Sequence, residues 1–171
     1  RSRDRRMPEE INRLVTVAIA DVLWTPSPDG DANLLAEGVP AERIDFVGNI
    51  MIDCYEMMRD AIAASGARAA LGLAGGDYGV VTLHRPSNVD TREALEPLVD
   101  ELVAVARSLP LVFAVHPRTR KRLTDFGLVE RLTDGGRIRL SDPLGYIDFM
   151  NLVSGARAVI TDSGCVQEEA T

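Results

Sequence analysis

Residues 78–118 read YGVVTLHRPSNVDTREALEPLVDELVAVARSLPLVFAVHPR, and this stretch decides the fold. The apolar runs at residues 78–83 and 111–115 predict two buried strands, and residues 92–108 between them predict a helix. Strands that are joined through a helix form a βα unit and lie parallel in one sheet. Both runs are apolar throughout, which is typical of strands that are covered on both faces.

The same alternation continues toward the C-terminus. Residues 118–126 and 146–154 predict two helices, each followed by an apolar run, at residues 138–140 and 158–161, that predicts a strand. The repeated order of strand and helix predicts an α/β fold with a Rossmann-like parallel sheet flanked by helices.

Toward the N-terminus the pattern is less regular. Three segments predict helices and two predict short strands; the helices are at residues 7–20, 29–37 and 50–64, and the strands are at residues 21–25 and 43–47. A glycine-rich stretch at residues 64–77 is the nearest feature to a linker in the chain.

Polar residues follow each strand of the regular half. His84 and Arg85 follow the strand at residues 78–83, and His116 follows the strand at residues 111–115. The carboxyl ends of parallel strands lie at one edge of the sheet, where open α/β folds bind ligands. The two histidines of the chain are therefore expected at that edge, although a purely structural role for both is the alternative.

The last strand leads into Asp162, Ser163 and Gly164, where a further helix begins. Free backbone N–H groups and the positive end of a helix dipole favour an anion at such a point. Glu169, about one turn further on, could accept hydrogen bonds from ribose hydroxyls. The segment predicts a site for a nucleotide diphosphate, and an ordinary helix cap is the alternative.

Composition limits the classes of function. Of the 171 residues 46% are hydrophobic, as in a globular protein, and the net charge is −7. This acidic balance argues against a general binder of nucleic acid or of membrane surfaces. Cys54 and Cys165 are expected to be free thiols of a cytoplasmic protein. No apolar run approaches the roughly 20 residues that span a bilayer, and no signal peptide is visible after Arg1.

Together these motifs resemble the non-hydrolysing UDP-N-acetylglucosamine 2-epimerases, whose fold is like that of the GT-B glycosyltransferases. The resemblance runs over essentially the whole chain and rests on segments in a fixed order: MPEEINR at residues 7–13, VGN at 47–49, TLHRPSNVD at 82–90, VHP at 115–117, PLGY at 143–146 and TDSGCVQEE at 161–169. Family enzymes are about twice as long and have two Rossmann-like domains. The resemblance therefore implies that residues 1–49 end the first domain, residues 50–77 form an interdomain helix and linker, and residues 78–171 form an incomplete UDP-binding domain.

The activity that the resemblance implies is a reversible inversion at C2 of UDP-N-acetylglucosamine, which yields UDP-N-acetylmannosamine for polysaccharide biosynthesis. UDP is eliminated and then added back to the other face, so the enzyme is an isomerase. No metal or organic cofactor is implied, and the full-length protein is expected to be a homodimer. The family's acid and base residues in the first domain are absent from this chain, so the 171 residues alone are expected to be inactive.

Site residues carry over from the family by position. His84 is the catalytic candidate, as a charged partner of phosphate or a proton shuttle. The residues implied to bind UDP are Leu144 and Phe149 at the uracil, Ser163, Gly164 and Cys165 at the diphosphate, and Glu169 at the ribose. For Phe149 the alternative is an ordinary place in the helix core. Arg85 and His116 match positions where some bacterial members bind a second, regulatory UDP-N-acetylglucosamine.

Three residues depart from the family pattern. Cys165 stands where a second glycine is usual, so its side chain is expected either to crowd the phosphate or to require a positive φ. Ser87 and Val17 stand where acidic residues are frequent. Two other functions remain open: a GT-B glycosyltransferase or hydrolysing relative, whose donor half would look similar, and a relative that binds nucleotide sugars without catalysis, which Cys165 and Ser87 favour.

Overall fold

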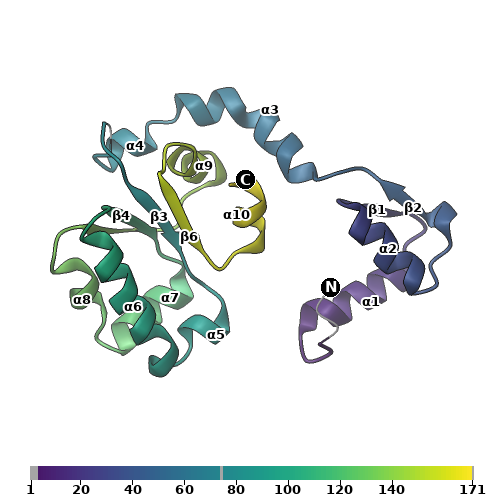
Figure 1. Cartoon of the computed structure of the whole chain (residues 1–171), viewed down its shortest axis with the longest axis horizontal. Helices are drawn as coiled ribbons and strands as arrows, with labels where there is room; N and C mark the ends of the chain where they lie inside the picture. Colours follow the sequence, from purple (N-terminus) through teal and green to yellow (C-terminus); the bar gives the residue numbers. More distant parts are fainter. Residues whose placement is uncertain (1–3, 74, 171) are drawn as a thin grey trace. The chain divides into compact units, whose positions relative to one another are not determined.

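The computed structural model describes residues 4–73 and 75–170. The chain divides into two compact units, Arg1–Cys54 and Tyr55–Thr171, called here the N-terminal unit and the C-terminal unit. Figure 1 shows the helices and strands of each. Helix α3, Ile50–Ala64, passes from one unit into the other.

The C-terminal unit contains a four-stranded sheet in the order β5-β4-β3-β6. The strands are β3 (Gly79–Thr82), β4 (Leu111–Ala114), β5 (Ile138–Ser141) and β6 (Ala158–Thr161). Every neighbouring pair is parallel. The α/β fold with a parallel sheet is thus confirmed, and all four strands lie where the sequence predicts them.

Helices precede, connect and follow the strands of this sheet along the chain. They are α4 (Ala67–Ala70), α5 (Pro86–Val89), α6 (Arg92–Ala106), α7 (Pro117–Asp125), α8 (Val129–Thr133), α9 (Tyr146–Ser154) and α10 (Gly164–Glu169). The sequence predicts α6, α7, α9 and α10. It does not predict α4, α5 and α8, which have four or five residues each and are too short to show a helical period.

Successive residues of a strand point to opposite faces of the sheet, and in the central strands β3 and β4 apolar residues on both faces are buried. Val81 and Phe113 belong to an apolar cluster that includes residues of α6, α7 and α8. Their neighbours Val80 and Val112 belong to a second cluster, with residues of α9 and with Ile62 of α3. Figure 1 shows α9 on one side of the sheet and α6 on the other.

The N-terminal unit is smaller. It contains α1 (Pro8–Ile19), β1 (Leu23–Thr25), α2 (Pro28–Ala36), the 3-10 helix η1 (Ala41–Arg43) and β2 (Ile44–Phe46), and its two strands are parallel. Ser27 caps α2 by accepting a hydrogen bond from the Gly30 amide. Gly38, which follows α2, has a φ of 85°, a left-handed conformation that glycine commonly adopts where a helix ends.

In the described part of the chain, no helix combines the length and the apolar character that a membrane crossing requires.

Candidate functional site

The carboxyl ends of β3 and β4 bring the two histidines together. His84 follows β3 and His116 follows β4, and their ring centroids are 5.8 Å apart with the planes tilted by 40°. The juxtaposition expected from the strand pattern is therefore present. His84 is 40% exposed and can be reached by a ligand.

Asp162, directly after β6, connects this histidine pair to the last motif of the chain. Its side chain is only 7% exposed. It accepts hydrogen bonds from the backbone amides of His84 (3.0 Å) and Arg85 (2.8 Å) and from the side-chain amide of Asn88 (3.1 Å). The His84 Nδ1 atom lies 3.0 Å from Asp162 Oδ1. The residues after β3 and the residues after β6 are thus held as one polar cluster.

The hydrogen bonds decide the charge of Asp162. Burial by itself would raise the pKa of this carboxyl. The donors on Arg85, His84 and Asn88, together with the nearby His84 ring, outweigh burial and lower the pKa below its ordinary value. Asp162 is therefore a carboxylate at neutral pH, and its negative charge is satisfied by the protein itself.

Sequence reasoning placed Asp162 in the polar turn but gave it no role. The sequence signal for Asp162 is its place in the TDSG segment directly after β6. An aspartate there lies beside the residues that follow the strand with which β6 pairs. That neighbour is β3, and the pairing of β6 with β3 is a property of the folded sheet.

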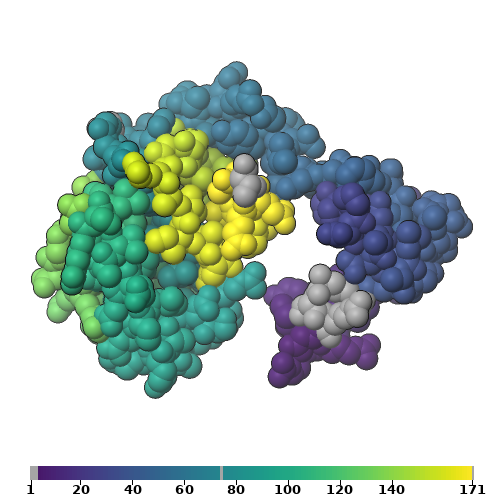
Figure 2. All heavy atoms as spheres, viewed as in Figure 1, coloured from purple at the N-terminus to yellow at the C-terminus, as the bar shows by residue number. Residues whose placement is uncertain are grey.

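Ser163 begins helix α10 and caps it. Its hydroxyl accepts a hydrogen bond from the Val166 amide at 3.5 Å, so the helix cap weighed as the alternative exists in the structure. The hydroxyl proton of Ser163 can still be donated to a ligand. Gly164 and Cys165 are exposed, and Figure 2 shows the yellow α10 atoms at the surface.

Cys165 is the second residue of α10 and has a helical backbone. The expectation that it requires a positive φ is therefore wrong, because the turn that precedes the helix ends at Ser163. Crowding of a ligand by its side chain is the part of the expectation that remains a prediction.

Glu169 lies at the end of α10 and is partly buried. Its Oε1 atom is buried and has no hydrogen-bond partner among the described residues. A buried carboxylate oxygen without a donor is costly, and native proteins rarely contain one. Hydroxyl donors on a ligand would remove this cost, which is the role predicted for Glu169 at a ribose.

Leu144 and Phe149 are partly buried and pack against the apolar cluster that contains Val80 and Met150. Phe149 therefore packs partly in the core, which agrees in part with the alternative that it is an ordinary core residue of the helix. Both residues retain some exposed surface, so packing does not exclude contact with a base.

Arg85 and His116, the residues matched to a regulatory site, both have partners in the fold. The Arg85 Nε atom donates to the backbone oxygen of Asp162 at 2.5 Å. His116 caps α7, since its Nδ1 accepts a hydrogen bond from the Arg118 amide at 3.2 Å. Arg118 also pairs with Asp90 at 2.8 Å and lowers the pKa of that carboxyl.

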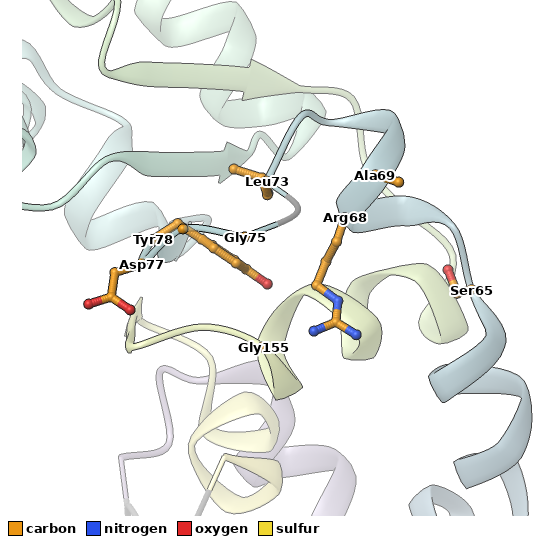
Figure 3. A pocket seen from close by; sticks show the side chains of 9 residues that line it. Ser65, Arg68, Ala69, Leu73, Gly75, Asp77, Tyr78 and Gly155 are labelled. Carbon is orange, nitrogen blue, oxygen red and sulfur yellow. The ribbon is translucent and has the colours of Figure 1, made fainter.

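A hollow of about 570 Å³ lies away from these residues, where β3 and β6 begin. Its lining includes Ser65, Arg68, Tyr78 and Gly155. Figure 3 shows Arg68 and Tyr78 reaching toward one another across it. None of the residues predicted from the sequence lines it.

No group of three or more His, Cys, Asp or Glu side chains within residues 4–73 and 75–170 is arranged to hold a metal ion. Cys54 and Cys165 are both exposed free cysteines.

Comparison with known proteins gives one family. The family model for UDP-N-acetylglucosamine 2-epimerase matches residues 1–171. A UDP-N-acetylglucosamine 2-epimerase of Methanocaldococcus jannaschii is 38% identical over 99% of this chain and 48% of the relative. A UDP-2,3-diacetamido-2,3-dideoxy-D-glucuronate 2-epimerase of Pseudomonas aeruginosa is 37% identical over 99% of this chain and 46% of the relative. The chain spans about half the length of these curated relatives.

Solved structures agree with the sequence matches. The crystal structure of the M. jannaschii enzyme in complex with UDP-N-acetylglucosamine and UDP superposes with a TM-score of 0.88 at 38% identity, over 99% of this chain and 48% of that one. The enzyme from Rickettsia bellii gives a TM-score of 0.85 at 31% identity, over 99% of this chain and 44% of that one.

Proposed function

Because the chain belongs to the UDP-N-acetylglucosamine 2-epimerase family, we propose that the complete protein interconverts UDP-N-acetylglucosamine and UDP-N-acetylmannosamine. The observation that carries the proposal is the polar cluster around Asp162. It joins the TLHRPSNVD and TDSGCVQEE motifs across 78 residues of sequence, at the edge of the sheet where α/β folds bind nucleotides.

The reaction proposed begins with removal of the proton on C2 and cleavage of the bond between C1 and the diphosphate oxygen. UDP leaves, the proton returns to the other face of C2, and UDP adds back to C1. The leaving diphosphate must be stabilised and retained for the second half, which requires preorganised donors. This chain would supply those donors, and the base that removes the proton from C2 would come from the part of the complete protein that these 171 residues do not cover.

The proposed UDP site lies at the junction of β6 and α10. Ser163, Gly164 and Cys165 would hold the diphosphate through backbone amides and the Ser163 hydroxyl. Glu169 would accept hydrogen bonds from the ribose hydroxyls. Its Oε1 atom, which has no hydrogen-bond partner among the described residues, supports this role. At the uracil, the backbone of Leu144 and the ring of Phe149 would make the contacts.

His84 is proposed to act on the diphosphate side of the sugar. A protonated imidazole can donate to the leaving phosphate oxygen and take the proton back when UDP returns. Arg85 and His116 remain the proposed residues of a regulatory site, and the three-part division at residues 1–49, 50–77 and 78–171 remains a prediction. A homodimer and a place in polysaccharide biosynthesis also belong to the proposal.

The test is incubation of the complete protein with UDP-N-acetylglucosamine, followed by proton NMR. A signal from the C2 epimer supports the proposal. Free sugar with UDP would instead show a hydrolysing relative. Binding of the substrate without turnover would show a nucleotide-sugar-binding relative that lacks activity.

A second substrate has its own support. The P. aeruginosa relative, whose name gives a diacetamido glucuronate as substrate, is 37% identical, against 38% for the M. jannaschii enzyme. The proposed UDP-binding residues contact the UDP group, which both substrates share, so they do not discriminate between the two sugars. The same NMR experiment with the diacetamido glucuronate nucleotide decides, because turnover of only one substrate assigns the specificity.

A further inference from the structure

Asp162 is held by the protein itself. Its carboxylate accepts hydrogen bonds from the backbone amides of His84 and Arg85 and from the Asn88 side chain, and the His84 Nδ1 atom lies 3.0 Å from its Oδ1. Because the side chain is also nearly buried, Asp162 acts on the site only through the groups that it holds.

The two histidines are held in opposite ways. His84 Nδ1 faces a carboxylate, which only accepts hydrogen bonds, so Nδ1 must carry a proton. His116 Nδ1 faces the backbone N–H of Arg118, which only donates, so Nδ1 must be unprotonated and Nε2 carries the proton. Neighbouring imidazoles in the same edge of the sheet are thus assigned different neutral tautomers.

We propose that Asp162 is a positioning residue that fixes His84 as the Nδ1–H tautomer and thereby confines its proton exchange to Nε2. Nδ1–H stays beside the carboxylate, 3.0 Å from Asp162 Oδ1, whether the ring is neutral or charged. Nε2, on the far side of the ring, is then the nitrogen that gives a proton to the leaving diphosphate and receives it again. The part of this inference that concerns the diphosphate rests on the proposed function.

The surrounding charges are consistent with this arrangement. Asp162 is the acidic group that contacts the His84 ring among the described residues, and Arg85 directs its Nε to the Asp162 backbone oxygen rather than to the carboxylate. The carboxylate therefore remains available to the imidazole. The His116 ring lies 5.8 Å from the His84 ring, and its Nδ1 is already engaged by the Arg118 amide at the start of α7.

The first experiment reads the tautomers directly. In the complete protein with ¹⁵N-labelled histidine, long-range proton–nitrogen NMR is recorded at about pH 8.5, well above the ordinary histidine pKa of about 6.5. The signals are assigned with His84→Gln and His116→Gln. We expect Nδ1–H for His84 and Nε2–H for His116, and an Nε2–H form of His84 would overturn the inference.

The second experiment removes the charge of Asp162. Asp162→Asn keeps the shape but offers a donor, so we expect His84 to shift to Nε2–H while His116 stays unchanged. The turnover number kcat should fall by about 100-fold or more, with KM and the Kd for UDP within about 3-fold. An unchanged His84 tautomer in this variant would contradict the proposal.

Asn88→Ala is the matched control. It removes one donor from the same carboxylate and leaves the His84 ring contact in place. We expect it to lower kcat by less than about 3-fold. A loss as large as that of Asp162→Asn would show that the carboxylate only braces the turn. Because the tautomer is measured without substrate, an inactive wild-type protein would disprove the proposed function and leave the tautomer assignment standing.

Discussion

The two units of the chain differ in how they bury apolar surface. In the C-terminal unit Phe113 is fully buried in a sheet that is covered on both faces. In the N-terminal unit only Leu23 and Leu34 are buried apolar residues among those described, and Trp24 is 72% exposed. Further apolar side chains of this unit are also exposed: Ile11, Val15, Ile19, Val22, Leu35 and Phe46. The C-terminal unit thus has its own core. The N-terminal unit instead exposes apolar surface of the kind that is typically buried in contacts with other protein segments.

The largest expected effect tests this contrast in stability. In the 171-residue chain, Phe113→Ala should lower the free energy of unfolding by about 3–5 kcal/mol, because a buried aromatic ring leaves a cavity. Trp24→Ala removes a larger side chain but should cost less than about 1 kcal/mol. Urea unfolding measures both.

Equal losses for the two variants would break the comparison. The complete protein gives a second test. If further sequence covers the N-terminal unit, Trp24→Ala should lower the free energy of unfolding of the complete protein by more than about 2 kcal/mol, as expected of a buried aromatic residue.

Many of the helices and strands could be predicted from the sequence. Helices α3 and α9 and strand β6 begin and end where the sequence pattern places them. The one-turn helices α5 and α8 could not be predicted in this way. The turn after β6 is predicted as a ligand site and as the start of a helix, and the structure confirms the helix; the positive φ expected as one alternative for Cys165 is absent.

The role of Asp162 shows why part of the site escapes sequence reasoning. Its partners are 74 to 78 residues away and become neighbours only because β6 pairs with β3. The partnerless oxygen of Glu169 is likewise a property of the folded packing. The residue types that follow the strands predict which edge of the sheet binds the ligand. The order of the strands in the sheet then determines which of these side chains come into contact.

The next prediction concerns two glutamates, one from each unit, that differ in their partners. Glu10, 5% exposed, pairs with Arg13 at 3.3 Å, whereas Glu169 Oε1 has no partner among the described residues. Glu169→Gln should weaken UDP binding to the complete protein by about 10- to 100-fold, since charged hydrogen bonds to the ribose are lost. Its free energy of unfolding should not fall. Calorimetry and urea unfolding give the two values.

Glu10→Gln is the control from the other unit. It should lower the free energy of unfolding by about 1–3 kcal/mol, because Arg13 loses a partner, and it should leave the Kd for UDP unchanged. A loss of stability in Glu169→Gln with unaltered UDP affinity would assign Glu169 to the fold instead of the ligand.

A smaller effect concerns acid stability. The pKa of Asp162 is lowered in the folded protein, so this carboxylate stabilises the fold above its unfolded pKa of about 3.9, and the contribution is lost as the pH falls through the folded pKa. Wild-type stability should therefore decline below about pH 4 more steeply than that of Asp162→Asn. Parallel pH profiles of the urea midpoint would contradict the assignment.

The smallest effect is expected at Cys165. Cys165→Gly restores the glycine usual in the family and removes a side chain from the first turn of α10. If that side chain crowds the diphosphate, the Kd for UDP should fall by a few-fold, even though glycine costs the helix up to about 1 kcal/mol relative to alanine. Calorimetry on the complete protein decides, and Cys54→Gly, in α3, supplies a control with the same change. Since Cys165 is already helical and exposed, an unchanged Kd would mean that the turn before α10 accommodates a side chain and that the family glycine serves something other than space.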